Sequence, residues 1–273
     1  MSGPLQVLVD GRAVDADWPL DRALQYGDGL FETLTVRAGQ LRFEALHRQR
    51  LGEGCRRLGI AADQDDVWRQ AVLLARAHGD CTLKILLSRG SSLERGYTPP
   101  RTARPRAVHM VYPAPNAGET PARVRLATLQ ALLGENPALA GLKHCNRLEQ
   151  ILGRMELQHI GAFEGLMGSS SGGLVSGTMS NVFICQDGEF VTPLLDHCGV
   201  AGVMRAVVLR EAAACGLAVR EARLPLSALR ECTSVFITNA RIGVVAAHEL
   251  DGRELGAHPA VQMLAGRVRA LAD

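Results

Sequence analysis

The sequence is poor in lysine, although it is not poor in positive charge. Only two of its 30 basic residues, Lys84 and Lys143, are lysines, and the rest are arginines. Either residue supplies charge at a surface, but only lysine forms a Schiff base or acts as a base near neutral pH. One explanation for the presence of each lysine is therefore that the protein needs its amine. The alternative is that it is present by chance.

The sequence also lacks the patterns of secreted, zinc-binding and membrane proteins. Its seven cysteines are odd in number and none has CxxC spacing, which predicts reduced thiols, no metal site and a cytoplasmic location. The N-terminus shows no basic segment followed by an apolar one, and no apolar run reaches the roughly 20 residues of a membrane span. A net charge of +2 indicates neither a nucleic-acid nor a membrane partner.

The first part of the chain predicts hairpins and two helices. Asp10-Gly11 and residues 38–40 are turn signals between strand-like segments. Apolar spacing predicts helices over 44–58 and 65–78. Strands follow near 81–88 and 106–112. We expect a smaller N-terminal domain over 1–111 and, from the Pro/Gly/Asn-rich composition, a linker over 112–121.

The rest of the chain, 122–273, predicts a larger domain that binds the cofactor. Strands are expected near 123–129, on both sides of Asp187-Gly188, near 218–223 and over SVFITN, with helices over 145–159, 203–215 and 258–271. Frequent hairpins do not fit a regular doubly wound sheet. The fold class expected is therefore α/β (α+β mixed), with two domains of mixed, largely antiparallel sheets. Ligand sites favour the cleft between such domains, where we expect the cofactor.

The surroundings of the two lysines differ. Lys84 lies in the strand-like run CTLKILLS, where we expect it to reach solvent from a sheet edge. Lys143 lies in a polar patch that opens a helix. Asn146 and Arg147 would share its face if the helix already covers position 143, and a nearby cation would favour the free amine. A solvated helix start is the alternative.

Three further segments suit anion binding. SGTMSN (residues 176–181) and GVAGVMR (199–205) combine small residues with a strand or helix start, where backbone N–H groups are free to bind phosphate. Arg89, Arg95 and Tyr97 lie in a glycine-rich stretch after a strand and suit carboxylate recognition. Each segment also has an alternative interpretation. SGTMSN would be an ordinary turn, GVAGVMR a helix start without a ligand, and the stretch with the two arginines a solvated loop.

Taken together and in order, these segments resemble a known family. LHRQRL, LKHCNRLEQ, SGTMSNVF, GVAGVMR and FITNAR are similar to motifs of the fold-type IV pyridoxal-phosphate enzymes, from about residue 21 to 250. That group contains branched-chain and D-amino-acid aminotransferases and aminodeoxychorismate lyases. NPALAGLKHCNRLEQ and SRG…RGY look most like the lyases.

The resemblance implies a set of site residues. Pyridoxal 5'-phosphate would form a Schiff base with Lys143, and its phosphate would be held by Arg50 and by backbone amides. Thr33 would be a second catalytic residue, a small-molecule substrate would bind through its carboxylates, and the protein would be a homodimer. The implied amides belong to Val203, Met204, Asn239 and Ala240, and the implied carboxylate ligands are Arg89, Arg95, Tyr97 and Arg241.

One position departs from the family pattern. Ser176 stands where the family usually has a Glu that pairs with the protonated pyridine nitrogen of the cofactor. A hydroxyl cannot hold a proton there by charge, which weakens the cofactor as an electron sink. An elimination that forms an aromatic ring needs that sink less than transamination does. The expected activity is therefore lysis of 4-amino-4-deoxychorismate to 4-aminobenzoate and pyruvate for folate synthesis. An aminotransferase and a non-catalytic cofactor-binding protein are the alternatives.

Overall fold

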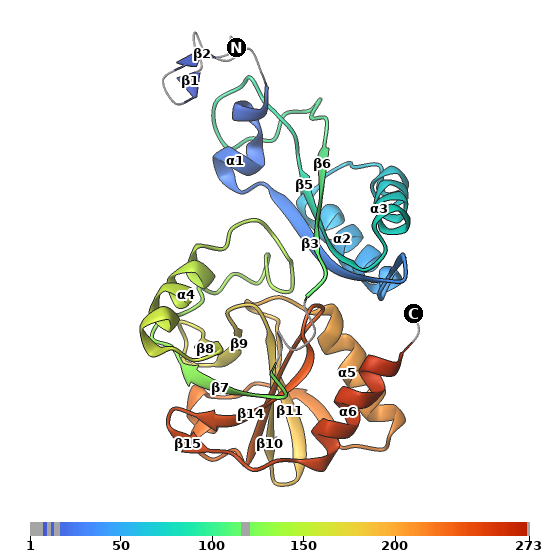
Figure 1. Cartoon of the computed structure of the whole chain (residues 1–273). Helices are drawn as coiled ribbons and strands as arrows, with labels where there is room; N and C mark the ends of the chain where they lie inside the picture. Colours follow the sequence, from blue (N-terminus) through green and yellow to red (C-terminus); the bar gives the residue numbers. More distant parts are fainter. Residues whose placement is uncertain (1–7, 10–11, 14–16, 116–120, 272–273) are drawn as a thin grey trace. The chain divides into compact units, whose positions relative to one another are not determined.

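The computed structural model describes residues 8–9, 12–13, 17–115 and 121–271. Internal contacts divide the chain into two units (Figure 1). Unit 1 comprises Met1–Ala114 and Lys143–Asn146, and unit 2 comprises Pro115–Leu142 and Arg147–Asp273. The boundary between Ala114 and Pro115 lies within the expected linker at 112–121, and the short segment Lys143–Asn146 is also assigned to unit 1. Part of the expected linker, 116–120, lies outside the described residues.

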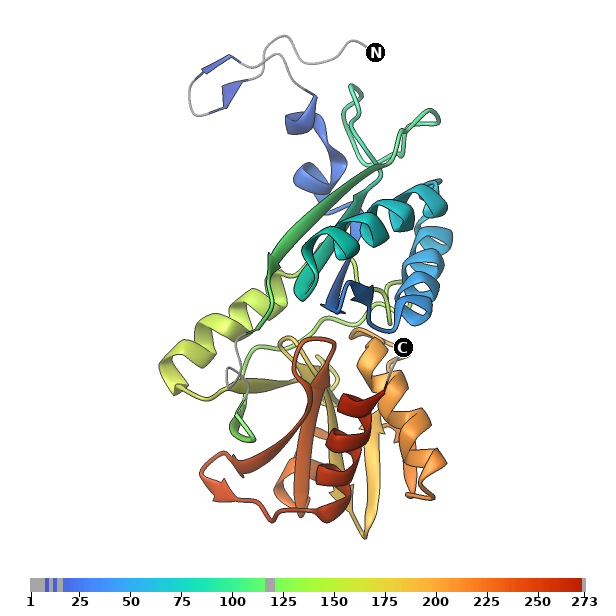
Figure 2. The same cartoon turned by 45° about the vertical axis from the view of Figure 1, so that its right-hand side comes forward.

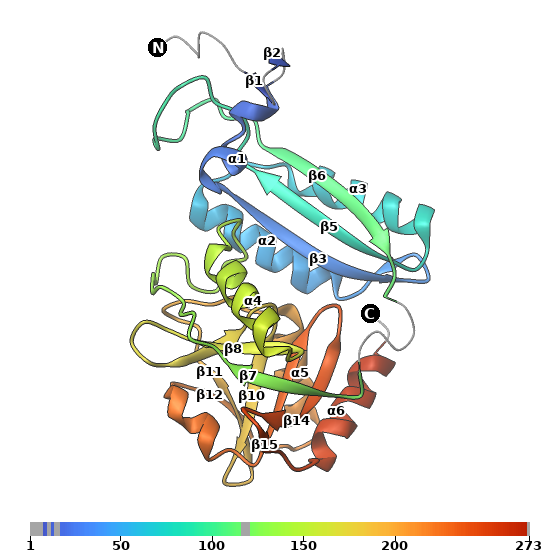
Figure 3. The same cartoon turned by 60° about the vertical axis from the view of Figure 1, so that its left-hand side comes forward.

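Unit 1 is built on a sheet with the strand order β4-β3-β5-β6, in which all pairs are antiparallel. Figure 3 shows α2 and α3 on one face of this sheet. The elements of unit 1 are β1 (Leu8–Val9), β2 (Arg12–Ala13), η1 (Trp18–Leu20), α1 (Arg22–Tyr26), β3 (Gly29–Arg37), β4 (Gln40–Leu41), α2 (Glu44–Leu58), α3 (Gln64–His78), β5 (Cys81–Ser88) and β6 (Arg106–Pro113).

Local sequence accounts for most of these boundaries. The predicted turn at 38–40 joins β3 to β4 through Ala38 (φ 49°) and Gly39 (φ 75°). Asp63 caps α3 by accepting a hydrogen bond from the Asp66 amide at 3.0 Å. The strands β1 and β2 pair as expected, although the turn residues 10–11 lie outside the described residues. The core between sheet and helices contains Leu34 and Trp68, both fully buried.

Unit 2 is built on a larger sheet with the order β12-β11-β10-β13-β14-β7-β8-β9, and β15 pairs with β14. Three pairs are parallel (β11 with β12, β14 with β7, β7 with β8) and the others are antiparallel. The elements of unit 2 are β7 (Arg123–Thr128), α4 (Leu148–Ile160), β8 (Glu164–Gly168), β9 (Leu174–Gly177), β10 (Asn181–Gln186), β11 (Glu189–Pro193), α5 (Val203–Ala214), β12 (Val219–Ala222), η2 (Leu226–Arg230), β13 (Ser234–Asn239), β14 (Gly243–Leu250), β15 (Arg253–Glu254) and α6 (Pro259–Ala270).

Both faces of the unit 2 sheet are buried. Val182 and Ile184 of β10 join one core, whereas Phe183 between them stacks on Phe236 of β13 with ring centroids 4.6 Å apart. The helices α5 and α6 lie side by side against the sheet (Figure 2). The predicted mixed, largely antiparallel architecture is confirmed. Among the described residues, no helix is both long and apolar enough to cross a membrane.

One sequence-based expectation about the lysines is wrong, and the condition attached to the other is not met. Lys84 does not lie at a sheet edge, because β5 is paired on one side with β3 and on the other with β6. Lys143 is not part of the following helix, because α4 begins only at Leu148. The helical array of Lys143 with Asn146 and Arg147 is therefore not formed.

Candidate active site

The segment that carries Lys143 extends the unit 1 sheet. The Lys143 carbonyl accepts a hydrogen bond from the Phe31 amide, and the Cys145 amide donates to the Gly29 carbonyl, each at 2.9 Å. The antiparallel bridge between Leu30 and His144 sets the register and places Lys143 across from Phe31. Backbone pairing, rather than a helix, thus fixes this lysine against β3.

Lys143 shares a sheet face with three other side chains. Side chains alternate along a strand, so Phe31 and Thr33 of β3 point to the same side, and Lys84 lies directly across from Thr33. The Nζ atom of Lys143 lies 4.2 Å from the centroid of the Phe31 ring, and that of Lys84 lies 5.3 Å from it. Both lysines therefore sit against one aromatic ring, an arrangement that cations favour.

The predicted phosphate ligand Arg50 lies on α2 in an ion pair with Glu32. Its Nε donates to Glu32 Oε1 at 2.8 Å, and His47 Nδ1 lies 2.6 Å from Glu32 Oε2. Burial opposes ionisation of Glu32, but the charge of Arg50 and the hydrogen bonds from His47 and Arg50 outweigh it. They lower the pKa of Glu32 to about 2. A carboxylate thus holds the guanidinium of Arg50 in place.

His47 completes this buried group. Its side chain is fully buried, and its Nε2 has no hydrogen-bond partner among the residues that the structure describes. Burial lowers the pKa of His47, and the positive charges of Arg50 and Lys143 lower it further, against the opposing effect of Glu32. The neutral imidazole is therefore the favoured form at neutral pH.

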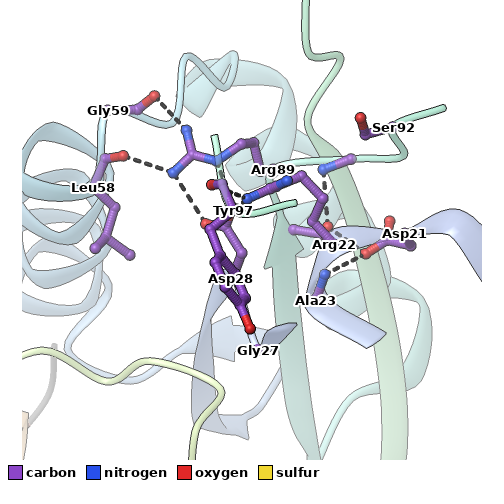
Figure 4. A network of polar contacts seen from close by, with 12 residues as sticks. Asp21, Arg22, Ala23, Gly27, Asp28, Leu58, Gly59, Arg89, Ser92 and Tyr97 are labelled. Carbon is purple, nitrogen blue, oxygen red and sulfur yellow. Dashed lines mark hydrogen bonds and ion pairs between the residues drawn. The ribbon is translucent and has the colours of Figure 1, made fainter. Parts of the chain in front are cut away.

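Arg89 is buried and held by other protein groups (Figure 4). Its guanidinium donates to both carboxylate oxygens of Asp28, at 2.7 and 3.0 Å. It also donates to the carbonyls of Leu58 and Gly59, at 2.7 and 2.8 Å, where α2 ends. Burial of Asp28 raises its pKa, but the hydrogen bonds and charges of Arg89 and Arg22 lower it by more. This arrangement ties the end of β5 to the end of α2.

Arg22 anchors the stretch that contains the other two predicted carboxylate ligands. It donates to Asp28 at 2.8 Å and to the carbonyls of Gly96 and Tyr97 at 3.2 and 2.8 Å. The Tyr97 side chain, 83% exposed, packs edge-on against Tyr26 with centroids 5.4 Å apart. Arg95 is exposed. The backbone of this loop is held while its side chains remain accessible.

In unit 2 a buried carboxylate shapes the SGTMSN segment. Glu164 of β8 accepts hydrogen bonds from the amides of Thr178 and Met179, at 3.2 and 3.1 Å, and from the Ser180 hydroxyl at 3.0 Å. A Cβ on Gly177 would clash with Ser180 and crowd Glu164, so this close approach requires glycine. The buried Ser176 hydroxyl donates to the Gly177 carbonyl at 2.9 Å.

The GVAGVMR segment provides a helix start that no side chain in the described part of the chain caps. Gly202 is the N-cap residue of α5, and the first helical bond runs from the Ala206 amide to its carbonyl. The amides of Val203 and Met204 therefore have no acceptor within the helix. Asn181 packs where a Cβ on Gly202 would lie, and donates to the Val200 carbonyl at 2.9 Å. The site accordingly offers free N–H groups at the positive end of a helix dipole.

The predicted residues of FITNAR lie close to SGTMSN. The Asn239 side chain accepts hydrogen bonds from the amides of Arg241 and Ile242, each at 2.9 Å, and donates to the Met179 carbonyl at 3.1 Å. Ala240 follows Asn239 in the turn from β13 to β14, and the side chain of Arg241 is exposed. Unit 2 thus brings its three predicted segments together.

The sequence interpretation missed the acids that hold these groups. Glu32 and Glu164 are buried in apolar strands, and an isolated acid within such a strand was the available signal. The predicted residues divide between the units: Lys143, Thr33, Arg50, Arg89, Arg95 and Tyr97 lie in unit 1, and Ser176, Val203, Met204, Asn239, Ala240 and Arg241 lie in unit 2.

Comparison with known proteins shows what this chain resembles. It is 32% identical over 227 residues to an aminodeoxychorismate lyase of Vibrio harveyi, covering 82% of this chain and 83% of the relative. A bifunctional aminodeoxychorismate lyase / D-amino acid transaminase of Mycobacterium tuberculosis is 27% identical, with 97% of each chain covered. The crystal structure of 4-amino-4-deoxychorismate lyase from Pseudomonas aeruginosa matches with a TM-score of 0.88 and 39% identity, covering 96% of this chain and 97% of that one.

The family comparison covers most of the same region. Residues 29–250 match the model of Amino-transferase class IV, a span that includes β3, the Lys143 segment and every strand of the unit 2 sheet except β15. The chain therefore belongs to the class IV aminotransferase family.

Proposed function

We propose that this protein is a pyridoxal-phosphate-dependent lyase that converts 4-amino-4-deoxychorismate to 4-aminobenzoate and pyruvate, a step that serves folate synthesis. The observation that carries the proposal is the position of Lys143. Its amine lies against the Phe31 ring, on the sheet face that also holds Thr33. The match to a lyase structure over 96% of the chain supports the same proposal.

The described residues fit pyridoxal phosphate. A phosphate dianion requires free N–H donors and positive charge, and the uncapped start of α5 offers the amides of Val203 and Met204. The turn of Asn239 and Ala240 and the guanidinium of Arg50 would complete the phosphate ligands, and Lys143 would hold the cofactor covalently. When bound, the cofactor supplies a conjugated ring that withdraws electrons from the substrate.

Residues of unit 1 would carry out the proton transfers of the reaction. Once the substrate amine has replaced it on the cofactor, the freed Lys143 amine would take the proton from the ring carbon, and that C–H electron pair would become part of the aromatic ring. The C–O bond of the enolpyruvyl ether breaks, and its electron pair leaves with the oxygen. A proton returned by Lys143, or by the Thr33 hydroxyl on the same face, would convert the enolpyruvate to pyruvate. Atoms balance without water or an oxidant.

The loop after β5 is proposed to recognise carboxylate. Four of the five N–H donors of Arg89 are taken by Asp28 and by the carbonyls that end α2. We therefore assign Arg89 to holding the loop. We assign carboxylate recognition to the exposed side chains of Arg95 and Tyr97 in this loop, and to the exposed Arg241 in the turn between β13 and β14.

An aminotransferase is the second candidate, because relatives of both activities resemble this chain. Ser176 favours the lyase. Its hydroxyl is engaged with the Gly177 carbonyl and carries no charge that could hold a proton on the pyridine nitrogen. Transamination depends more on that proton than an aromatising elimination does.

The two lysines allow a direct test of this function. Lys143→Ala should abolish the visible absorbance of the bound cofactor, whereas Lys84→Arg should keep it. Borohydride reduction followed by peptide mass spectrometry should place the pyridoxyl group on Lys143. Fluorescence of released 4-aminobenzoate then measures lyase activity, and D-alanine with 2-oxoglutarate tests for transamination. Pyridoxyl on Lys84, or transamination without lysis, would contradict the proposal.

We also propose that two copies associate through α4, in the cytoplasm. Leu148, Ile151, Leu152 and Met155 form a stripe at helical spacing and are each more than half exposed. An apolar stripe of this kind favours association with a matching surface. All seven cysteines are free thiols, which supports a reducing compartment. Leu152→Glu should give a monomer in light scattering, and an unchanged mass would remove α4 from the interface.

A further inference from the structure

We propose that Glu164 is a positioning residue for the phosphate of pyridoxal 5'-phosphate. Its carboxylate holds residues 178–180, and that segment holds the turn that contains Asn239 and Ala240. The inference rests on the proposed function, in which the amides of this turn bind the phosphate. It adds the buried acid that keeps those amides in place.

The carboxylate of Glu164 occupies an anion-binding concavity formed by the SGTMSN segment. Its Oε1 accepts hydrogen bonds from the amides of Gly165 and Thr178, at 2.9 and 3.2 Å, and from the Thr178 hydroxyl at 2.5 Å. Its Oε2 accepts from the Met179 amide at 3.1 Å and from the Ser180 hydroxyl at 3.0 Å. Successive amides that converge in this way form a site for an anion, and here the anion belongs to the protein itself. The segment therefore supports the phosphate site instead of binding phosphate through these amides.

Hydrogen bonds do most to stabilise the buried Glu164. The residue is 2% exposed. Arg154 Nη1 lies 3.7 Å from Oε1, but the Arg154 side chain is 41% exposed, and solvent weakens such an ion pair. Burying a carboxylate is costly unless it is paired and hydrogen-bonded, and N–H and O–H donors bind an ionised acceptor more strongly than a neutral one. The charge of Glu164 therefore fixes the conformation of residues 178–180.

One side chain carries this position to the proposed phosphate ligands. Asn239 donates to the Met179 carbonyl at 3.1 Å, so it is anchored to the SGTMSN segment. Its side-chain oxygen accepts hydrogen bonds from the amides of Arg241 and Ile242, each at 2.9 Å. These bonds close the turn around Ala240. A shift of Met179 would therefore move the amides that we assign to the phosphate.

The residue that follows the held segment makes a second link. Asn181 is 6% exposed, and its side chain donates to the Val200 carbonyl at 2.9 Å. It also fills the space beside Gly202, where a Cβ would lie 2.0 Å from the Asn181 Oδ1. Gly202 is the N-cap residue of α5, whose first amides are the other proposed phosphate ligands of unit 2. Residues 178–181 thus connect to both groups of ligands.

The experiment compares the full-length wild type with Glu164→Gln, Asn239→Ala, the double variant and Glu156→Gln. Glutamine keeps the volume of Glu164, but its NH2 group replaces one acceptor oxygen and meets the donors of residues 178–180. Glu156 is the matched control, because it also accepts two backbone amides in unit 2, those of Gln130 and Ala131, at 2.8 and 3.0 Å. Neither amide belongs to a proposed phosphate ligand.

Three measurements separate cofactor binding from folding. Absorbance titration gives the affinity for pyridoxal phosphate, and phosphorus-31 NMR of each loaded protein reports the surroundings of the phosphate. Circular dichroism reports whether each variant is folded. A role in folding alone would lower stability but leave the phosphorus resonance unchanged.

Glu164→Gln should weaken pyridoxal-phosphate binding about ten- to a hundredfold, the usual range for removing a group that orients a ligand-binding residue. Its phosphorus resonance should differ from that of the wild type, whereas Glu156→Gln should match the wild type in both measurements. The double variant should bind about as weakly as the weaker of the two single variants, because both changes break the same connection.

A milder variant covers the case in which Glu164→Gln does not fold. Ser180→Ala removes one donor to the carboxylate and adds no volume. Loss of one such hydrogen bond should weaken cofactor binding about two- to tenfold and shift the phosphorus resonance.

Three results would overturn the inference. The first is wild-type cofactor affinity and resonance in Glu164→Gln, or in Ser180→Ala if the first variant is unfolded. Equal losses in Glu164→Gln and Glu156→Gln would show only a general weakening of unit 2. Additive losses in Glu164→Gln and Asn239→Ala would break the link through Met179. Failure of the proposed function is distinguishable, because it appears in the wild type as no cofactor on Lys143 and no 4-aminobenzoate.

Discussion

Replacing Glu32 by glutamine should strongly destabilise unit 1. The Glu32 side chain is 1% exposed and pairs with the 13% exposed side chain of Arg50. Glutamine nearly preserves the volume, so no cavity opens, but the guanidinium loses its charged partner in a buried site. Removing one member of a buried ion pair typically costs about 3–5 kcal/mol of unfolding free energy. We expect a loss of that size.

Urea unfolding followed by tryptophan emission measures this loss in the relevant unit. The chain has two tryptophans, of which Trp68 is fully buried in the unit 1 core and Trp18 is 49% exposed. In a Trp18→Phe background, emission therefore reports on unit 1. Glu53→Gln is the matched control, because Glu53 pairs with Arg56 on the exposed side of α2 and should change little. A wild-type urea midpoint for Glu32→Gln would refute the reasoning.

The pH dependence gives the same test a second readout. The pKa of Glu32 is about 2 in the folded protein, against an ordinary value of 4.5. Its contribution to stability is therefore complete above about pH 4.5 and is lost as the pH falls towards 2. Glu32→Gln should lack this decline. The lowered pKa of His47 acts in the same direction, because the unfolded chain takes up its proton first as the pH falls below 6.5.

Three further predictions concern the cofactor and the substrate loop. Arg50→Ala should weaken pyridoxal-phosphate binding about ten- to a hundredfold through loss of one charge-assisted pair, measured by absorbance titration, and unchanged affinity would remove Arg50 from the phosphate site. Asp28→Asn should leave Arg22 and Arg89 without their shared carboxylate. The loop that contains Gly96 and Tyr97 should then become more sensitive to proteolysis. Cleavage kinetics like those of the wild type would contradict this role of Asp28. Ser176→Glu should protonate the pyridine nitrogen, if the longer side chain fits, and raise transamination of D-alanine more than lysis; a protonated nitrogen-15 shift of labelled cofactor in the wild type would disprove the premise.

Local sequence determined most of the secondary structure and the order of the motifs. The turn at Ala38 and Gly39, the helix Glu44–Leu58 and the strand Ser234–Asn239 lie where apolar spacing and turn residues place them. The position of a turn, a helix or a strand along the chain is marked by the local residue pattern, so this pattern was sufficient to predict it. Family motifs in one order were likewise enough to indicate a lysine-bound cofactor.

Only the tertiary structure decided which side chains meet. Lys143 looked like the start of a helix, yet backbone pairing with Gly29 and Phe31 makes it part of a sheet more than 100 residues earlier in the chain. Lys84 looked like an edge residue, but β6 covers the other side of its strand. Strand pairing joins segments that are distant in the sequence, and no local pattern records which strand lies beside which.

The same reason explains why the supporting residues were missed. Glu164 accepts hydrogen bonds from the amides of Thr178 and Met179, which lie in a later segment. Asp28 pairs with Arg22 and Arg89, which come from two different parts of the chain. The role of a buried acid depends on its hydrogen-bond and ion-pair partners, and tertiary packing decides which residues those are. The sequence by itself therefore determined which reactive side chains are present, while the folded units determined which of them are held by other groups of the protein.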